Sequence, residues 1–159
     1  MDNFKKNNKF LGYLRFLTYT GDLNQIASVY LNPLVLNIET CEVVKRKLRM
    51  PAISVENEKA MLKKLENIAQ TSLSMYPQTY EEDMELLKNE KLTFNERNCI
   101  VYRAGEKKIY LQIIEMVKLG TQLLLMDHIN ALQYFNSINK DLVYGTYFSK
   151  VLIPLLDKK

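Results

Sequence analysis

The sequence has few of the residues that most often build catalytic or metal sites. It contains one histidine, His128, and two cysteines, Cys41 and Cys99, without C-x-x-C spacing. A structural zinc site normally takes four nitrogen or sulfur ligands, so this set excludes a histidine-rich metal centre and argues against zinc. The motifs G-x-G-x-x-G, G-x-x-x-x-G-K-[ST] and G-x-S-x-G are also missing from the sequence. We therefore expect no catalytic, metal-binding or cofactor-binding residue in this chain.

Long apolar runs are missing as well. The longest, such as the one near Leu123–Met126, are too short to span a bilayer, and residues 1–10 have no apolar signal core. Two widely separated cysteines are typical of reduced thiols. We expect an intracellular protein with no membrane partner, and the sequence does not distinguish cytoplasm, nucleus and plastid.

Turn-forming residues are scarce. Only five glycines and four prolines interrupt 159 residues, and no sustained alternation of apolar and polar residues marks strands. Such a sequence favours long helices with short connections. We predict an all-α fold: a single orthogonal multi-helix domain of about seven helices that spans residues 1–159.

Apolar spacing and caps place the expected helices. They cover 10–17, a short stretch after Asp22, about 39–49, 55–75, 80–88, a long helix from 93, one after Gly120, and a last one after Asp141 that ends near Pro154. Ser54 is expected to cap the helix that starts at residue 55. Its solvent face is predicted to carry Glu58, Lys63, Lys64 and Glu66. In the long helix, Gly105 is interpreted as a bend or a close helix crossing, and one apolar face is predicted to carry Ile109, Ile113, Met116 and Val117.

The net charge of +4 is mild, and the basic excess is local. The basic residues gather in two runs: Lys5, Lys6, Lys9 and Arg15, then Lys45, Arg46, Lys47 and Arg49. Both runs read as solvated helix faces or a flexible start, and the second provides our candidates for contact with an anionic partner. Nucleic acid is disfavoured as a partner, because no recognisable RNA-binding motif accompanies these residues.

Helix-start signals and charges are densest between residues 76 and 117. Thr79 with Glu82, and Thr93 with Glu96, each have the T-x-x-E spacing of a capping box. An acidic cluster, Glu81, Glu82, Asp83 and Glu85, opens one helix, where it complements the helix dipole. The same cluster could instead dock a lysine-bearing segment. The basic residues of the turn at 103–108 could pair with this cluster or within their own helix.

Three stretches carry a family resemblance in combination: P-A-I-S-V-E-N-E at 51–58, Y-P-Q-T-Y-E-E-D-M-E-L-L at 76–87, and L-T-F-N-E-R-N-C-I-V-Y-R-A-G-E-K-K-I at 92–109. In this order they resemble the C-terminal helical, substrate-binding domain of the Rubisco large-subunit methyltransferase group of SET-domain protein-lysine methyltransferases. The resemblance covers about 10–117, and 118–159 reads as a helical extension.

The resemblance implies a non-catalytic domain that binds the protein substrate of an S-adenosylmethionine-dependent protein-lysine N-methyltransferase. The catalytic SET domain and its S-adenosylmethionine would lie outside this chain. The implied partners are the protein that carries the target lysine and the SET domain of the same polypeptide. The candidate substrate-binding residues are Tyr76, Glu81, Glu82, Asp83, Arg103 and Lys107. The alternative function is a free-standing helical protein-interaction adaptor or a weak nucleic-acid-binding module.

Overall fold

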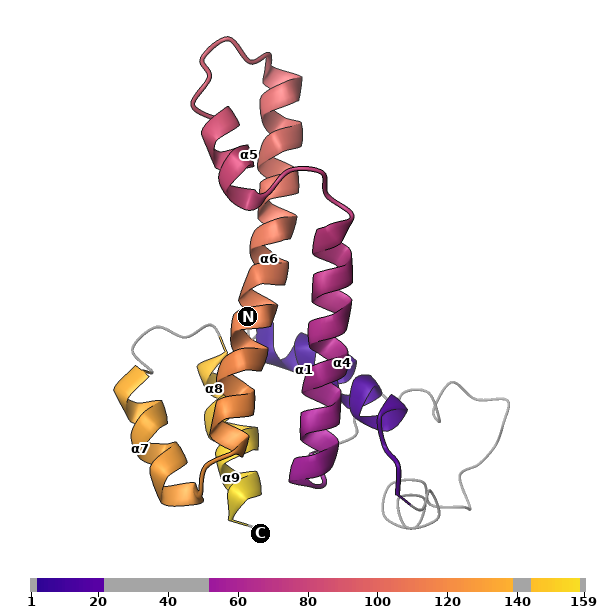
Figure 1. The fold of residues 1–159 in the computed structure, drawn as a ribbon, viewed down its shortest axis with the longest axis vertical. Helices are drawn as coiled ribbons and strands as arrows, with labels where there is room; N and C mark the ends of the chain where they lie inside the picture. Colours follow the sequence, from indigo (N-terminus) through magenta and orange to yellow (C-terminus); the bar gives the residue numbers. More distant parts are fainter. Residues whose placement is uncertain (1–2, 22–51, 139–143, 158–159) are drawn as a thin grey trace, which may run out of the picture. The chain divides into compact units, whose positions relative to one another are not determined.

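The fold is helical throughout the described residues, which in this computed structural model are 3–21, 52–138 and 144–157. The helices are α1 (Asn3–Leu17), α4 (Val55–Ser74), α5 (Tyr80–Leu86), α6 (Phe94–Leu124), α7 (His128–Ile138), α8 (Gly145–Tyr147), a π-helical stretch (Phe148–Leu152) and α9 (Ile153–Leu156) (Figure 1). The all-α prediction is confirmed. When the last three elements are counted as one continuous helix, these residues form six helices rather than about seven. The helices expected after Asp22 and over 39–49 lie outside the described residues.

The chain divides into two compact units, which are described separately. The first comprises residues 1–64 and 120–159, and the second comprises residues 65–119. The prediction of a single domain over 1–159 stays a prediction. Within the parts of the chain that the structure describes, no helix has the length and hydropathy of a membrane span.

Helix α4 starts where its cap predicts. The Ser54 hydroxyl accepts a hydrogen bond from the Asn57 N–H at 3.1 Å, which satisfies one of the free amides of the first turn. The buried face of α4 carries Met61, Leu62, Leu65 and Ala69, as the helical spacing predicts.

A buried polar network joins three helices of the first unit. Arg15 of α1 donates to Glu58 of α4 through Nε to Oε2 and Nη2 to Oε1, both at 2.7 Å. The hydroxyl of Tyr147 in α8 donates to Oε1 of the same carboxylate at 2.5 Å. Burial, together with the negative charge of Glu58, raises the pKa of Tyr147 well above its ordinary value.

The predicted exposure of both charged residues in this network is wrong. Arg15 is 1% exposed and Glu58 is 0% exposed. Glu58 lies three positions after the buried Val55 and four before the buried Leu62, so it belongs to the inward stripe of α4. Burial is tolerated because a bidentate guanidinium and a hydroxyl satisfy the carboxylate.

Gly120 marks a close approach inside the first unit. The sequence predicts a new helix after Gly120, but α6 continues through it to Leu124. A Cβ at Gly120 would lie 3.2 Å from Leu152 Cδ1 and 3.3 Å from Leu62 Cδ1, so only glycine leaves these neighbours undisturbed. Among the described residues no helix crosses closely at Gly105, since a Cβ there would meet none of them within 4 Å.

The last helix passes its proline instead of ending at it. Pro154 has no N–H to donate, so one α-helical bond is lost at this point. The preceding residues take the wider π-helical register, in which the Ile153 N–H bonds to the carbonyl of Phe148. The helical path then continues to Leu156, beyond the predicted end near Pro154.

Candidate protein-binding surface

The acidic helix α5 is held on α6 by a buried carboxylate. Asp83, which is 0% exposed, accepts hydrogen bonds from Arg103 Nε at 3.0 Å and from Arg103 Nη2. Lys107 Nζ donates to Asp83 Oδ2 at 2.6 Å, the same oxygen that accepts from Arg103 Nε. It also donates to the carbonyl of Thr79 at 3.2 Å. Arg103 and Lys107 are four residues apart, so they lie on one face of α6, where α5 packs beside it (Figure 1).

The surroundings of Asp83 favour its charged form. Burial raises the pKa of this carboxyl, but the hydrogen bonds from Arg103 and Lys107 outweigh burial and bring the pKa below its ordinary value. Asp83 and Lys107 therefore form a desolvated ion pair that would be costly to break from one side.

Tyr76 completes this cluster. Its hydroxyl donates to Glu106 Oε2 at 2.7 Å, and this bond to a carboxylate is the main reason that the pKa of Tyr76 rises to about 12. Lys107 Nζ lies 5.1 Å from the centre of the Tyr76 ring, within the range of a cation–π contact. We call these five residues, Tyr76, Asp83, Arg103, Glu106 and Lys107, the α5–α6 clamp.

Both predicted capping boxes are confirmed. At the start of α5, the Glu82 N–H bonds to Thr79 Oγ1 at 3.1 Å, and the Thr79 N–H bonds to Glu82 Oε2 at 2.7 Å. At the start of α6, the Glu96 N–H bonds to Thr93 Oγ1 at 3.3 Å, and the Thr93 N–H bonds to Glu96 Oε2 at 2.9 Å. These boxes fix where both helices begin, and so they set the register in which the clamp residues meet.

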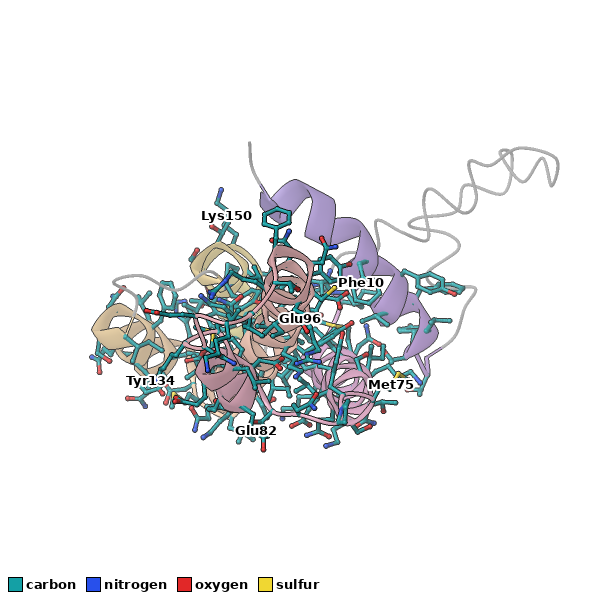
Figure 2. All side chains as sticks on the ribbon, turned by 90° about the horizontal axis from the view of Figure 1, so that it is seen from above. Phe10, Met75, Glu82, Glu96, Tyr134 and Lys150 are labelled. Carbon is teal, nitrogen blue, oxygen red and sulfur yellow. The ribbon has the colours of Figure 1, made fainter. Side chains whose placement is uncertain are left out.

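The structure separates the sequence-predicted candidates into inner and outer residues. Asp83 and Lys107 are buried, and this corrects their assignment to a surface: neither charge can meet a docked partner. Arg103 and Tyr76 are half-buried, and their side chains bond to other members of the clamp. Glu81 and Glu82 are exposed, and Glu82 lies at the outer edge of the side chains in Figure 2 although it also serves the cap.

The remaining residues that the sequence singles out are the second basic run and the one histidine. Lys45, Arg46, Lys47 and Arg49 lie outside the described residues. The ring of His128, the first residue of α7, has its Nδ1 3.0 Å from Asp157 Oδ1. Among the residues that the structure describes, no three His, Cys, Asp or Glu side chains gather as metal ligands would.

Sequence reasoning missed two features of α6. Glu106 was not among the candidate residues, and its bond to Tyr76 joins positions 30 residues apart, so no local signal marks it. The apolar face predicted to carry Ile109, Ile113, Met116 and Val117 is buried at Met116 and Val117, but Ile109 is 55% exposed. Val101 and Tyr102 are likewise exposed, by 53% and 71%, so the described residues leave this stretch of α6 uncovered on the side away from the clamp.

A comparison with protein-family models assigns the class of this helical module. Residues 6–109 match the family described as Rubisco LSMT substrate-binding, and the chain belongs to this family. The matched range includes the whole clamp and both capping boxes, whereas residues 110–159 lie beyond it. The comparisons with curated proteins and with solved structures find no match.

Proposed function

We propose that this chain binds the protein substrate of a SET-type, S-adenosylmethionine-dependent protein-lysine N-methyltransferase, without catalysing methyl transfer itself. The observation that carries the proposal is the family membership over residues 6–109. The SET domain of the same polypeptide, outside this chain, would hold S-adenosylmethionine and the lysine.

The clamp explains how the family signature could serve binding without touching the substrate. Its bonds hold α5 at a fixed place on α6, so that the outward face of α5 is preorganised. Glu81 and Glu85 lie four residues apart on that face and are both exposed, and Glu85 also pairs with Lys88 at 2.5 Å. We assign to them the electrostatic attraction of a basic, lysine-bearing segment, an interaction that speeds association more than it deepens affinity.

The experiment uses the immobilised chain to capture proteins from extracts of its source cells. Captured proteins are mapped for methylated lysines by mass spectrometry, and binding is compared with that of Glu81→Lys and Glu85→Lys. Glu115→Lys, which reverses an exposed charge elsewhere on α6, is the matched control.

We expect a captured protein with methylated lysine, retained by Glu115→Lys and weakened by the two α5 variants. Captured proteins without methyl-lysine would contradict the proposed function. Equal binding by all variants would contradict the role of α5 alone. Methyl transfer from S-adenosylmethionine by the isolated chain would overturn the non-catalytic assignment.

A further inference from the structure

One face of α6 is exposed and apolar although α5 covers the opposite side. Val101, Tyr102 and Ile109 are 53%, 71% and 55% exposed, and Gly105 lies between them on the same face. At 100° per residue, Arg103 and Lys107 of the clamp point about 160° away from Gly105. We call Val101, Tyr102, Gly105 and Ile109 the α6 stripe.

Gly105 has no explanation within the described residues. Glycine weakens a helix interior relative to alanine. A Cβ at this position would nevertheless meet nothing within 4 Å, so no described neighbour requires its absence. A glycine at the centre of an exposed apolar face suits a second helix that crosses closely at that point, because the missing side chain lets two backbones approach.

The residues around Gly105 are complementary to themselves in reverse order. Four residues before and after Gly105 stand two apolar side chains, Val101 and Ile109. Three residues before and after stand an aromatic ring and a cation, Tyr102 and Lys108, both exposed. These four positions, with Gly105, lie on the side of α6 that a helix crossing there would contact.

The next pair follows the same symmetry. Asn98 and Gln112, seven residues before and after Gly105, both carry amides that can donate and accept hydrogen bonds. If two copies of α6 were related by a two-fold axis through Gly105, the apolar side chains of one copy would therefore face those of the other. The aromatic ring of each copy would face the cation of the other, and the amides would face each other. An isologous interface needs this property, since residue i of one copy meets residue j of the other and the reverse.

We propose that the α6 stripe binds a second copy of this chain, with the two α6 helices antiparallel and crossing at Gly105. Val101 packs against Ile109 of the second copy, and Tyr102 receives its Lys108 in a cation–π contact. The rows 101, 105 and 109 are spaced by four residues, which is the spacing of the most frequent helix crossing in globular proteins. The inference does not depend on the proposed function, because the clamp and the outer face of α5 remain uncovered.

The test is the oligomeric state of the full chain in reducing buffer, measured by sedimentation over a range of concentrations. We expect a concentration-dependent dimer. Gly105→Leu places a bulky side chain at the crossing and should weaken dimerisation by at least about tenfold. Cys99→Leu is the matched control, since it adds a similar side chain at an exposed position about 120° around α6; it should dimerise normally.

Folding and dimerisation are separable in this design. Because a Cβ at Gly105 would meet no described residue within 4 Å, Gly105→Leu should unfold at a temperature no lower than that of the wild-type chain when both are measured at concentrations where they are monomeric. The register is tested by cross-linking: in a Cys41→Ser, Cys99→Ser background, Gly105→Cys should form a disulfide-linked dimer on oxidation and Lys118→Cys should not.

A wild-type chain that stays monomeric at all concentrations overturns the proposal, as does a Gly105→Leu chain that dimerises normally. A monomeric chain whose Gly105→Leu variant loses a captured protein partner also overturns it, and assigns the α6 stripe to that partner.

Discussion

The α5–α6 clamp predicts that one buried carboxylate carries a large share of the stability of its unit. Asp83→Asn keeps the side-chain volume but removes the charge that pairs with Lys107, which is only 1% exposed. Lys107 would keep its hydrogen bond to the carbonyl of Thr79 and its cation–π contact with the ring of Tyr76, but it would lose the carboxylate of Asp83. Removing one partner of a buried pair typically costs about 3–5 kcal/mol, because the other charge stays desolvated.

Such a loss is a large part of the free energy of unfolding, which for a domain is about 5–15 kcal/mol. Each kcal/mol lowers the melting temperature of a chain of this size by about 2–4 °C, so we expect a decrease of about 6–20 °C. Urea denaturation followed by far-ultraviolet circular dichroism measures the free energy directly.

A double-mutant cycle separates the pair from general damage. Lys107→Met should cost less than Asp83→Asn, because Asp83 keeps its two hydrogen bonds from Arg103. The double variant should be more stable than the sum of the single losses predicts by about 1 kcal/mol or more. A cost below about 1 kcal/mol for Asp83→Asn, or strict additivity, would refute the clamp as a desolvated ion pair.

Further predictions concern pH, the second buried network, the two glycines and a cap. The pKa of Asp83 is lower in the folded chain than in the unfolded one. Its contribution to the free energy of unfolding is therefore complete above about pH 4 and is lost as the pH falls through the folded pKa. The difference in the free energy of unfolding between wild type and Asp83→Asn, measured in urea, should shrink as the pH falls. Glu58→Gln removes the negative charge that pairs with the buried Arg15 and should lower the free energy of unfolding by about 3 kcal/mol in the same assay, whereas Tyr147→Phe should lower it by about 1–2 kcal/mol. At concentrations where the chain is monomeric, Gly105→Ala should raise the free energy of unfolding by about 0.5–1 kcal/mol. Gly120→Ala should be at least about 1 kcal/mol less stable than Gly105→Ala in parallel denaturation curves. Thr79→Ala removes the side chain of a capping box and should lower the free energy of unfolding by about 1 kcal/mol. An unchanged urea midpoint would contradict a stabilising role for this box.

Capping signals predicted the starts of α4, α5 and α6 correctly. Ser54, Thr79 and Thr93 each bond to an amide three residues ahead, so the sequence contains both partners within one turn. Position in the chain is then sufficient to identify the cap, and the tertiary fold has little influence on it.

Buried charges could not be predicted in the same way. The partner of Glu58 is Arg15, 43 residues away, and a helical pattern assigns any charged residue to the solvent face. Asp83 posed the same difficulty: it could complement the dipole of α5, face a partner or pair with α6. Only the packing of α5 on α6 decides between these, and packing is a property of the fold.

The glycines show a further limit of sequence reasoning. The residue type indicates a close approach, but it does not identify the neighbour. A Cβ at Gly120 would meet Leu152 and Leu62 within its own unit, whereas a Cβ at Gly105 would meet no described residue within 4 Å. The sequence could have been read for the symmetry around Gly105, yet that symmetry has meaning only once the exposure of this face is known.

The central claim, that this chain recognises the protein substrate of a lysine methyltransferase, is tested most directly by competition in the source cells. The chain is expressed in excess, and methyl-lysine is quantified across the proteome by mass spectrometry. We expect methylation of a specific lysine to fall when the wild-type chain is expressed, and to fall less with Glu81→Lys. Unchanged methylation at every site, with the chain folded and abundant, would contradict the central claim.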